Sequence, residues 1–199
     1  MNRNSSIALL GAVLAVSVGL MGTSGVFSMP NSVATSESNT DGGKLLGHLT
    51  VTVKDPQGNI KAYRQMDNTV VNTGKICTIA AAFGTPASSC AVAPGGFQYI
   101  GVGIGATSEQ TSQTQLTTEQ VRNARSTVTT VNATGATGAQ VVQSATFGFG
   151  TNNLSIQESG IFDNANIGSG HMFSRKLISP TVNVNIGDTL TVTWTITAG

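Results

Sequence analysis

The sequence predicts an all-β protein: a single antiparallel β-sandwich or jelly-roll-like domain with one short helix, preceded by an N-terminal hydrophobic leader helix. Stretches with strand-like alternation recur roughly every ten residues and are separated by turn signals, which is the pattern of such folds. Only 10% of the 199 residues are charged, against about 25% in an average soluble protein. Gly, Thr, Ser and Asn supply the polarity instead, which is typical of exported β proteins.

The last stretch of the chain is the clearest strand. Leu190, Val192, Trp194 and Ile196 alternate with threonines, after a Gly187-Asp188 turn signal. Because successive strand side chains point to opposite faces, this order places an apolar row on one face and hydroxyls on the other. We expect this strand to close the fold and to bury the single tryptophan.

The chain divides into three predicted segments. Residues 1–34 have the features of a secretory signal peptide, with an apolar core from Ile7 to Met21 and a small-x-small cleavage site at 32–34. The alternative is a retained anchor, since residues 7–29 carry no charge and are long enough to span a bilayer. Residues 35–44 form a polar, glycine-containing arm, and residues 45–199 form the domain.

The domain is expected to begin with a hairpin over residues 45–65, which turns at Asp55-Pro56-Gln57-Gly58-Asn59. Residues 116–125 are expected to form a short helical turn. The remaining strands are expected at 69–71, 97–105, 126–131, 140–149, 154–162, 171–178, 181–186 and 189–197.

The best candidate for a helix is Lys75 to Phe83. Ile76, Ile79, Ala80 and Phe83 recur at helical spacing, and the following Gly84 and Pro86 are typical helix terminators.

Cys77 and Cys90 are the only cysteines. In an exported protein an even number of cysteines favours a disulfide, which would join this helix to the loop after it. The alternative is a pair of buried free thiols. Neither a redox pair nor a zinc site fits this spacing.

Several motifs have both a functional and a structural interpretation. The run from Gly101 to Ala106 matches a dinucleotide-binding fingerprint, but no apolar helix follows it, so structural glycines are expected. Asp163 to Gly168 does not fit the ligand pattern of a calcium loop. Glu158 and Asp163 are the best candidates for paired glycosidase carboxylates, but nothing in the sequence fixes their separation, and salt bridges or a buried, hydrogen-bonded glutamate are the favoured interpretation.

Two sequons, at Asn132 and Asn153, lie in expected loops and are candidates for glycosylation; chance matches are common in such a composition.

The net charge of the chain argues against two further classes of protein, nucleic-acid binders and polybasic membrane-docking proteins. Without Arg3 of the leader, nine basic residues face nine acidic ones, so the exported part is about neutral. A nucleic-acid binder would show a basic stripe, and polybasic membrane docking would need a lysine cluster. The sequence therefore predicts contact with a membrane only through an uncleaved leader, and no cofactor or metal.

Six motifs recur in the order found in small phage and archaeal-virus structural proteins, and the chain resembles that family over residues 67–199. They are Phe97-Gln-Tyr-Ile-Gly-Val-Gly103, Leu116-Thr-Thr-Glu-Gln-Val-Arg122, Ala145-Thr-Phe147, Ile156-Gln-Glu-Ser-Gly-Ile-Phe-Asp163, Gly170-His-Met-Phe-Ser-Arg175 and the terminal Gly187–Ile196 stretch. The resemblance implies a β-rich tail or capsid-surface protein without enzymatic activity. Glu119, Arg122 and Glu158 match the shared pattern, and we expect them to form a structural polar network. The exported N-terminus departs from that family.

These observations favour a secreted or cell-surface structural protein that assembles with itself through strand edges and the 35–44 arm. The alternative is a secreted carbohydrate- or surface-binding β-sandwich module. A secreted hydrolase is the third interpretation, with Glu158 and Asp163 as its candidates.

Overall fold

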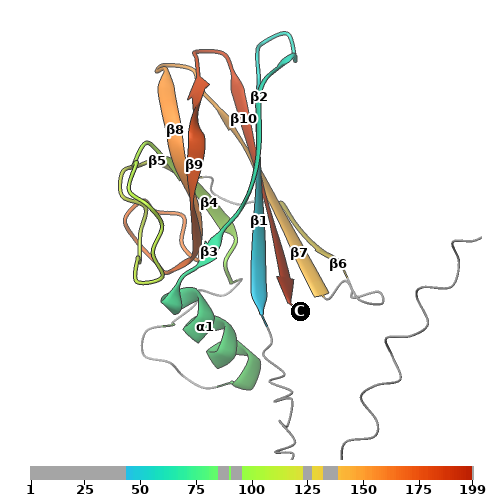
Figure 1. The fold of residues 1–199 in the computed structure, drawn as a ribbon, viewed down its shortest axis with the longest axis vertical. Coiled ribbons are helices and arrows are strands. Elements are labelled where there is room, and N and C mark those ends of the chain that lie inside the picture. The colour runs from blue at the N-terminus through green and yellow to red at the C-terminus, as the bar shows by residue number, and fades with distance from the viewer. Residues whose placement is uncertain (1–43, 85–89, 91–95, 123–126, 132–138, 199) are drawn as a thin grey trace, which may run out of the picture. The chain divides into compact units, whose positions relative to one another are not determined.

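The computed structural model describes residues 44–84, 90, 96–122, 127–131 and 139–198, which form ten strands and one helix (Figure 1). The strands build two five-stranded sheets in which all neighbours are antiparallel. The prediction of an all-β sandwich with one short helix is therefore confirmed. The predicted leader, and the arm up to residue 43, lie outside the described residues.

The first sheet has the order β2-β1-β10-β7-β6. Its strands are β1 (Leu45–Lys54), β2 (Ile60–Asp67), β6 (Thr127–Val131), β7 (Ala139–Gly148) and β10 (Thr189–Ala198). β1 pairs with β10 from Leu45↔Ala198 to Lys54↔Thr189, and β7 pairs with the other side of β10 over the same length. The terminal strand is thus the centre of this sheet.

The second sheet has the order β3-β9-β8-β4-β5. Its strands are β3 (Thr69–Val70), β4 (Tyr99–Gly103), β5 (Glu119–Arg122), β8 (Leu154–Phe162) and β9 (Met172–Val184). The sequence predicted two strands where β9 is continuous. Pro180 lies in the stretch of β9 where the pairing with β8 shifts, between Glu158↔Leu177 and Ile156↔Val182. A proline is tolerated there because no regular ladder bond needs its missing N–H.

The core lies between the sheets. Leu190, Val192 and Trp194 are completely buried, as the alternation predicted, and Ile156 and Ile161 of β8 are buried in the same cluster. The Trp194 Nε1–H donates to Ser159 Oγ at 3.3 Å, which gives the indole a polar partner on the opposite sheet.

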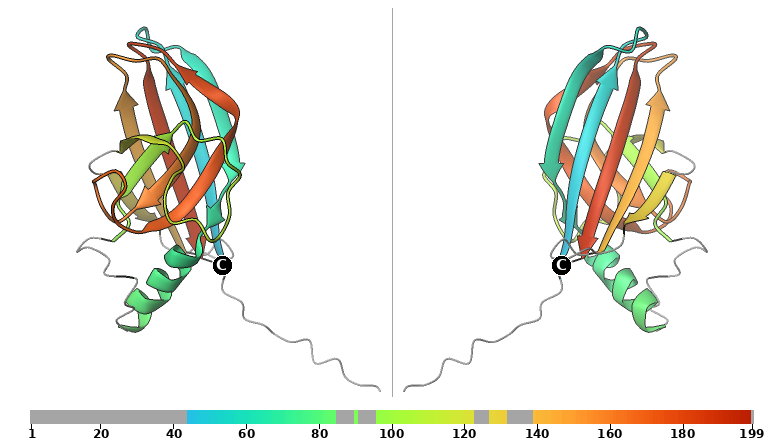
Figure 2. Two further views of the ribbon diagram at one scale, coloured as in Figure 1. Left: turned by 90° about the vertical axis from the view of Figure 1, so that its left-hand side faces the viewer. Right: turned by 90° about the vertical axis from the view of Figure 1, so that its right-hand side faces the viewer.

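The helix α1 (Asn72–Phe83) begins three residues before the predicted start. It ends where expected, because Gly84 adopts the left-handed conformation (φ 61°) and its N–H bonds to the Ala80 carbonyl. Gly74 allows α1 to rest on β9, since a Cβ there would stand 2.2 Å from the Phe173 carbonyl oxygen. Figure 2 shows α1 projecting from the end of the sandwich at which β10 finishes.

The predicted helical turn at 116–125 is wrong, because Glu119–Arg122 forms the edge strand β5. This segment pairs with β4, so tertiary pairing overrides a weak local helical signal. Within the described residues, no helix is long and apolar enough to cross a membrane.

Candidate functional site

Glu158 of β8 is the centre of a buried polar site. Its side chain is completely buried. The carboxylate accepts hydrogen bonds from the backbone N–H of Thr118 (2.7 Å), Thr117 (3.0 Å) and Gly105 (3.1 Å), and from Thr117 Oγ1 (2.9 Å). It also forms an ion pair with Arg175 of β9, whose Nη2 lies 2.8 Å from Glu158 Oε2. Both carboxylate oxygens are therefore fully engaged.

Arg175 uses its remaining donors to hold the segment between β4 and β5. Its Nη2 donates to the carbonyl of Thr107 at 2.8 Å, and Nη1 donates to Gln113 Oε1 at 3.1 Å. The guanidinium is itself completely buried, and a buried charge is tolerated only when paired and hydrogen-bonded in this way. The Glu158–Arg175 pair thus fastens residues 105–118 to the second sheet.

Three glycines of the run that resembles a dinucleotide fingerprint, Gly101, Gly103 and Gly105, make room for the carboxylates of Glu158 and Glu119. A Cβ at Gly103 would stand 2.7 Å from Glu158 Oε1 and 2.4 Å from the Thr118 carbonyl oxygen. A Cβ at Gly105 would stand 2.4 Å from the same Glu158 oxygen, and one at Gly101 would stand 2.5 Å from Glu119 Oε1. Glycine is therefore needed at these three positions because any side chain would collide with neighbouring atoms.

Glu119 and Arg122 form a second buried pair, with Arg122 Nη2 2.6 Å from Glu119 Oε2. On a regular strand, residues three apart point to opposite faces. Here β5 contains one extra residue, because Gly103 pairs with Glu119 while Val102 pairs with Val121. This bulge shifts the alternation and brings the two side chains to the same face.

Arg122 also fastens the loop after β8. Its Nη1 donates to the carbonyls of Asn164 (2.9 Å), Asn166 (2.8 Å) and Ser169 (2.9 Å). Its guanidinium carbon lies 3.6 Å from the centre of the Phe162 ring, which is a cation–π contact. Each ion pair therefore holds one loop. Glu158–Arg175 holds the segment between β4 and β5, and Glu119–Arg122 holds the loop after β8.

The electrostatics of Glu158 follow from these contacts. Burial by itself would raise the pKa of the carboxyl group. The hydrogen bonds from Thr118, Arg175 and Thr117 outweigh burial and hold the pKa of Glu158 below its usual value. The site therefore stabilises a carboxylate anion and supplies no proton near neutral pH.

Asp163, the other candidate carboxylate, binds different partners. It is buried and accepts from the His171 backbone N–H at 2.7 Å, and its other oxygen lies 2.8 Å from His171 Nδ1. Among the described residues, no group of three or more His, Cys, Asp and Glu side chains is arranged to hold a metal ion.

The predicted disulfide is confirmed: Cys77 of α1 is bonded to Cys90, with the two Cα atoms 5.2 Å apart. Asn153 is exposed, and its Oδ1 accepts a hydrogen bond from the Ile186 N–H at 2.9 Å. Asn132 lies outside the described residues. Glycosylation at both sequons stays a prediction.

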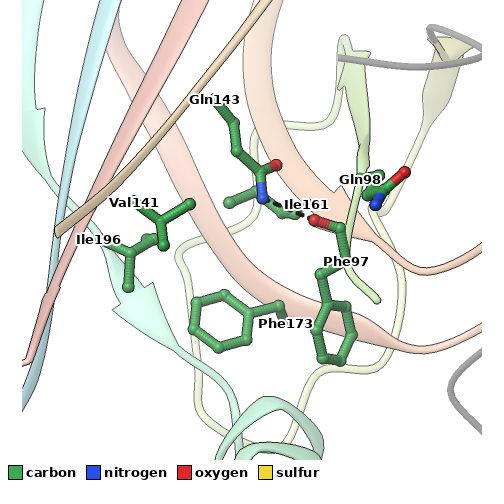
Figure 3. A pocket seen from close by; sticks show the side chains of 7 residues that line it. All are labelled: Phe97, Gln98, Val141, Gln143, Ile161, Phe173 and Ile196. Atoms are coloured by element: carbon green, nitrogen blue, oxygen red, sulfur yellow. Dashed lines mark hydrogen bonds between the residues drawn. The ribbon is translucent and has the colours of Figure 1, made fainter. Parts of the chain in front are cut away.

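A pocket of about 270 Å³ opens between the sheets near α1. Figure 3 shows Phe97 and Phe173 on one side of it and Val141 and Ile196 on another. The two rings lie 5.2 Å apart, and Gln143 Nε2 donates to the Phe97 carbonyl at 2.6 Å across the pocket. The lining is therefore mostly apolar, with two amide side chains, Gln98 and Gln143.

Sequence reasoning missed two features of the site. Arg175 was only part of a resemblance motif, because nothing local links it to Glu158, which lies seventeen residues earlier. The helical spacing of apolar residues does not show which face of α1 packs: of the four periodic residues only Ala80 is buried, while Ile76, Ile79 and Phe83 are exposed. The helix instead packs through Gly74, Cys77 and Ala80.

The fold and this site define an antiparallel β-sandwich whose loops are fastened by two buried Arg–Glu pairs. Comparison of the chain with family models, characterised proteins and solved structures finds no match in any of the three.

Proposed function

We propose that this chain is a non-enzymatic, exported structural protein and a subunit of a cell-surface filament or virion-like assembly. The buried ionic groups support this proposal, because each described Arg–Glu pair uses its hydrogen bonds to hold loops. The Cys77–Cys90 disulfide is in keeping with an oxidising compartment, such as the cell exterior. Export itself rests on the leader-like residues 1–34.

The observation that carries the proposal is the difference between the two edges of the first sheet. The edge strand β2 carries Lys61, Arg64 and Asp67, and charges on an edge oppose pairing with another chain. The opposite edge strand, β6, has the sequence Thr-Val-Thr-Thr-Val and no charge. An uncharged edge of β-branched residues is a ready template for adding a strand from a neighbouring subunit.

The experiment compares a charge added to each edge. We expect Thr129→Lys in β6 to abolish or strongly reduce assemblies seen by negative-stain microscopy and light scattering, because a lysine on an open edge opposes strand addition. The matched control is Gln65→Lys in β2, which adds the same charge to an edge that is already charged and should leave assembly intact. Equal assembly by both variants, or a monodisperse wild-type monomer, would contradict the proposal.

The pocket in Figure 3 favours a second candidate, a carbohydrate- or surface-binding module, because it places two aromatic rings and two amide side chains together. A sugar site would stack a ring on Phe97. Binding on a glycan array that is lost in Phe97→Ala would support this function. No binding of the wild type to any glycan on the array would contradict it.

A further inference from the structure

One end of the domain exposes a cluster of large apolar side chains. Ile76, Ile79 and Phe83 of α1 are 48%, 60% and 75% exposed, and Leu46 at the start of β1 is 57% exposed. The three helical residues share one face because they are three and four positions apart. We call these four residues the basal patch. They lie at the end of the sandwich where β1 begins and β10 finishes (Figures 1 and 2).

A groove of about 600 Å³ joins the two parts of this patch. Its walls are the start of β1 (Lys44, Leu45 and Leu46), the end of β10 (Ala198) and α1 (Lys75, Thr78 and Ile79). Helix and sheet therefore present a single surface, with two lysines among its apolar residues.

Both lysines lack a carboxylate partner in the described part of the chain. Each described carboxylate is bound elsewhere. The pairs are Asp67 with His48, Asp188 with Lys61, Glu109 with Lys176, Glu119 with Arg122, Glu158 with Arg175 and Asp163 with His171, and Asp55 accepts bonds from Asn59. The basal surface thus combines exposed hydrocarbon with two lysines that have no carboxylate partner among the described residues.

We propose that the basal patch docks on the surface of an anionic lipid bilayer, a contact that the near-neutral sequence did not predict because Lys44 and Lys75 meet only in the folded domain. Aliphatic and aromatic side chains beside lysines are the composition of proteins that lie at such an interface. The apolar groups enter the headgroup boundary, and the ammonium groups remain among lipid phosphates. This proposal concerns the folded domain and is independent of the strand-edge assembly proposed above.

The connection to the rest of the chain supports this partner. The uncharged stretch 7–29 precedes the domain, and the chain enters the domain at Lys44, which is part of the basal groove. The fourteen intervening residues span at most about 50 Å when fully extended. If the stretch is retained as an anchor, the basal patch stays within reach of the bilayer at a high effective concentration.

A second copy of the chain fits the patch less well. A symmetric contact between two basal patches would bring lysines against lysines. A head-to-tail contact would place them against the opposite end, where Asp55 and Asp188 already have partners. Lipid phosphates supply the negative charge that the protein's own described surface does not.

The experiment places a tryptophan in the patch of the full chain and measures its quenching by brominated acyl chains. Phe83→Trp is compared with Ile60→Trp, a residue of similar exposure (62%) at the start of β2, in vesicles of phosphatidylcholine and phosphatidylserine. Trp194 is completely buried in both variants and gives a common background. We expect the Phe83→Trp emission to fall about two-fold, with no change for Ile60→Trp.

Charge dependence provides the second readout. Adding Lys44→Gln and Lys75→Gln to Phe83→Trp, or removing phosphatidylserine, should weaken the quenching because the electrostatic attraction is lost. Equal quenching at positions 83 and 60, or none at position 83, would overturn the proposal. Concentration-dependent protection of position 83 from iodide without vesicles would also overturn it, by showing that another copy covers the patch.

Discussion

At the scale of single residues, Glu158 determines what its neighbours can be. A completely buried carboxylate needs donors on every side, and it obtains three of them from backbone N–H groups that approach closely. Close approach leaves no room for a side chain at Gly103 or Gly105. Glycine at positions 103 and 105 is therefore a consequence of one buried anion.

We expect Gly103→Ala to lower the free energy of unfolding by about 2 kcal/mol or more, because overpacking against backbone cannot be relieved by a rotamer change. The added Cβ would meet the Thr118 carbonyl oxygen at 2.4 Å. Urea unfolding followed by circular dichroism measures the change. Gly148→Ala is the control, since a Cβ there meets nothing within 4 Å. Equal stabilities of the two variants would contradict the steric argument.

Replacement of Glu158 by glutamine leaves Arg175 buried without its counter-ion. We expect a loss of about 3 kcal/mol in the free energy of unfolding, in line with breaking a buried pair. Asp67→Asn is the control. Its contact with His48 is exposed, so its loss should cost less than about 1 kcal/mol. A Glu158→Gln protein as stable as the wild type would contradict the assignment.

The pH dependence of stability gives an independent check on Glu158. Its folded pKa is lowered, so its contribution is fully present above the pKa of an unfolded glutamate, about 4.3. That contribution is lost as the pH falls below this value and through the folded pKa. We expect urea midpoints of the wild type to fall over this acidic range and those of Glu158→Gln to fall less. Parallel curves would show that Glu158 does not contribute.

At the scale of elements, a bulge in the edge strand β5 makes the Glu119–Arg122 ion pair possible. The bulge in β5 brings Glu119 and Arg122 to one face, and Arg122 then holds three carbonyls of the loop that joins β8 to β9. Without the bulge, the pair could not form on a strand. The position of the loop between β8 and β9 therefore depends on one extra residue in β5, although β4 separates β5 from β8 in the sheet.

We expect Arg122→Lys to speed amide hydrogen exchange in residues 164–170 by about tenfold or more, because one ammonium cannot replace the planar, multi-donor guanidinium. Exchange in β10 should stay unchanged. Arg64→Lys is the control, since Arg64 donates to the neighbouring Tyr63 carbonyl. Unchanged protection of the loop would mean that Arg122 does not hold it.

At the scale of the whole described domain, Trp194 joins the two sheets. It lies in β10, at the centre of the first sheet, and its indole N–H bonds to Ser159 in the second. Ser159 Oγ in turn donates to the Gly101 carbonyl of β4 at 3.0 Å. The tryptophan therefore reports on the packing of both sheets.

We expect tryptophan fluorescence and far-ultraviolet circular dichroism to give coincident unfolding curves, because separating the sheets removes the core of both. The native emission should be blue-shifted, since Trp194 is completely buried. A fluorescence change that precedes the loss of strand signal would show that the sheets separate before they unfold.

The sequence by itself determined the fold class, most strand positions, the helix end at Gly84 and the Cys77–Cys90 disulfide. These follow from local physical rules: period-two alternation, glycine's tolerance of positive φ and the pairing of two cysteines. The tertiary structure alone decided that residues 119–122 form a strand, that Glu158 pairs with Arg175 and that Ile76, Ile79 and Phe83 of α1 are exposed. Each of these depends on contacts between elements distant in sequence, and no local pattern specifies which element a segment will meet.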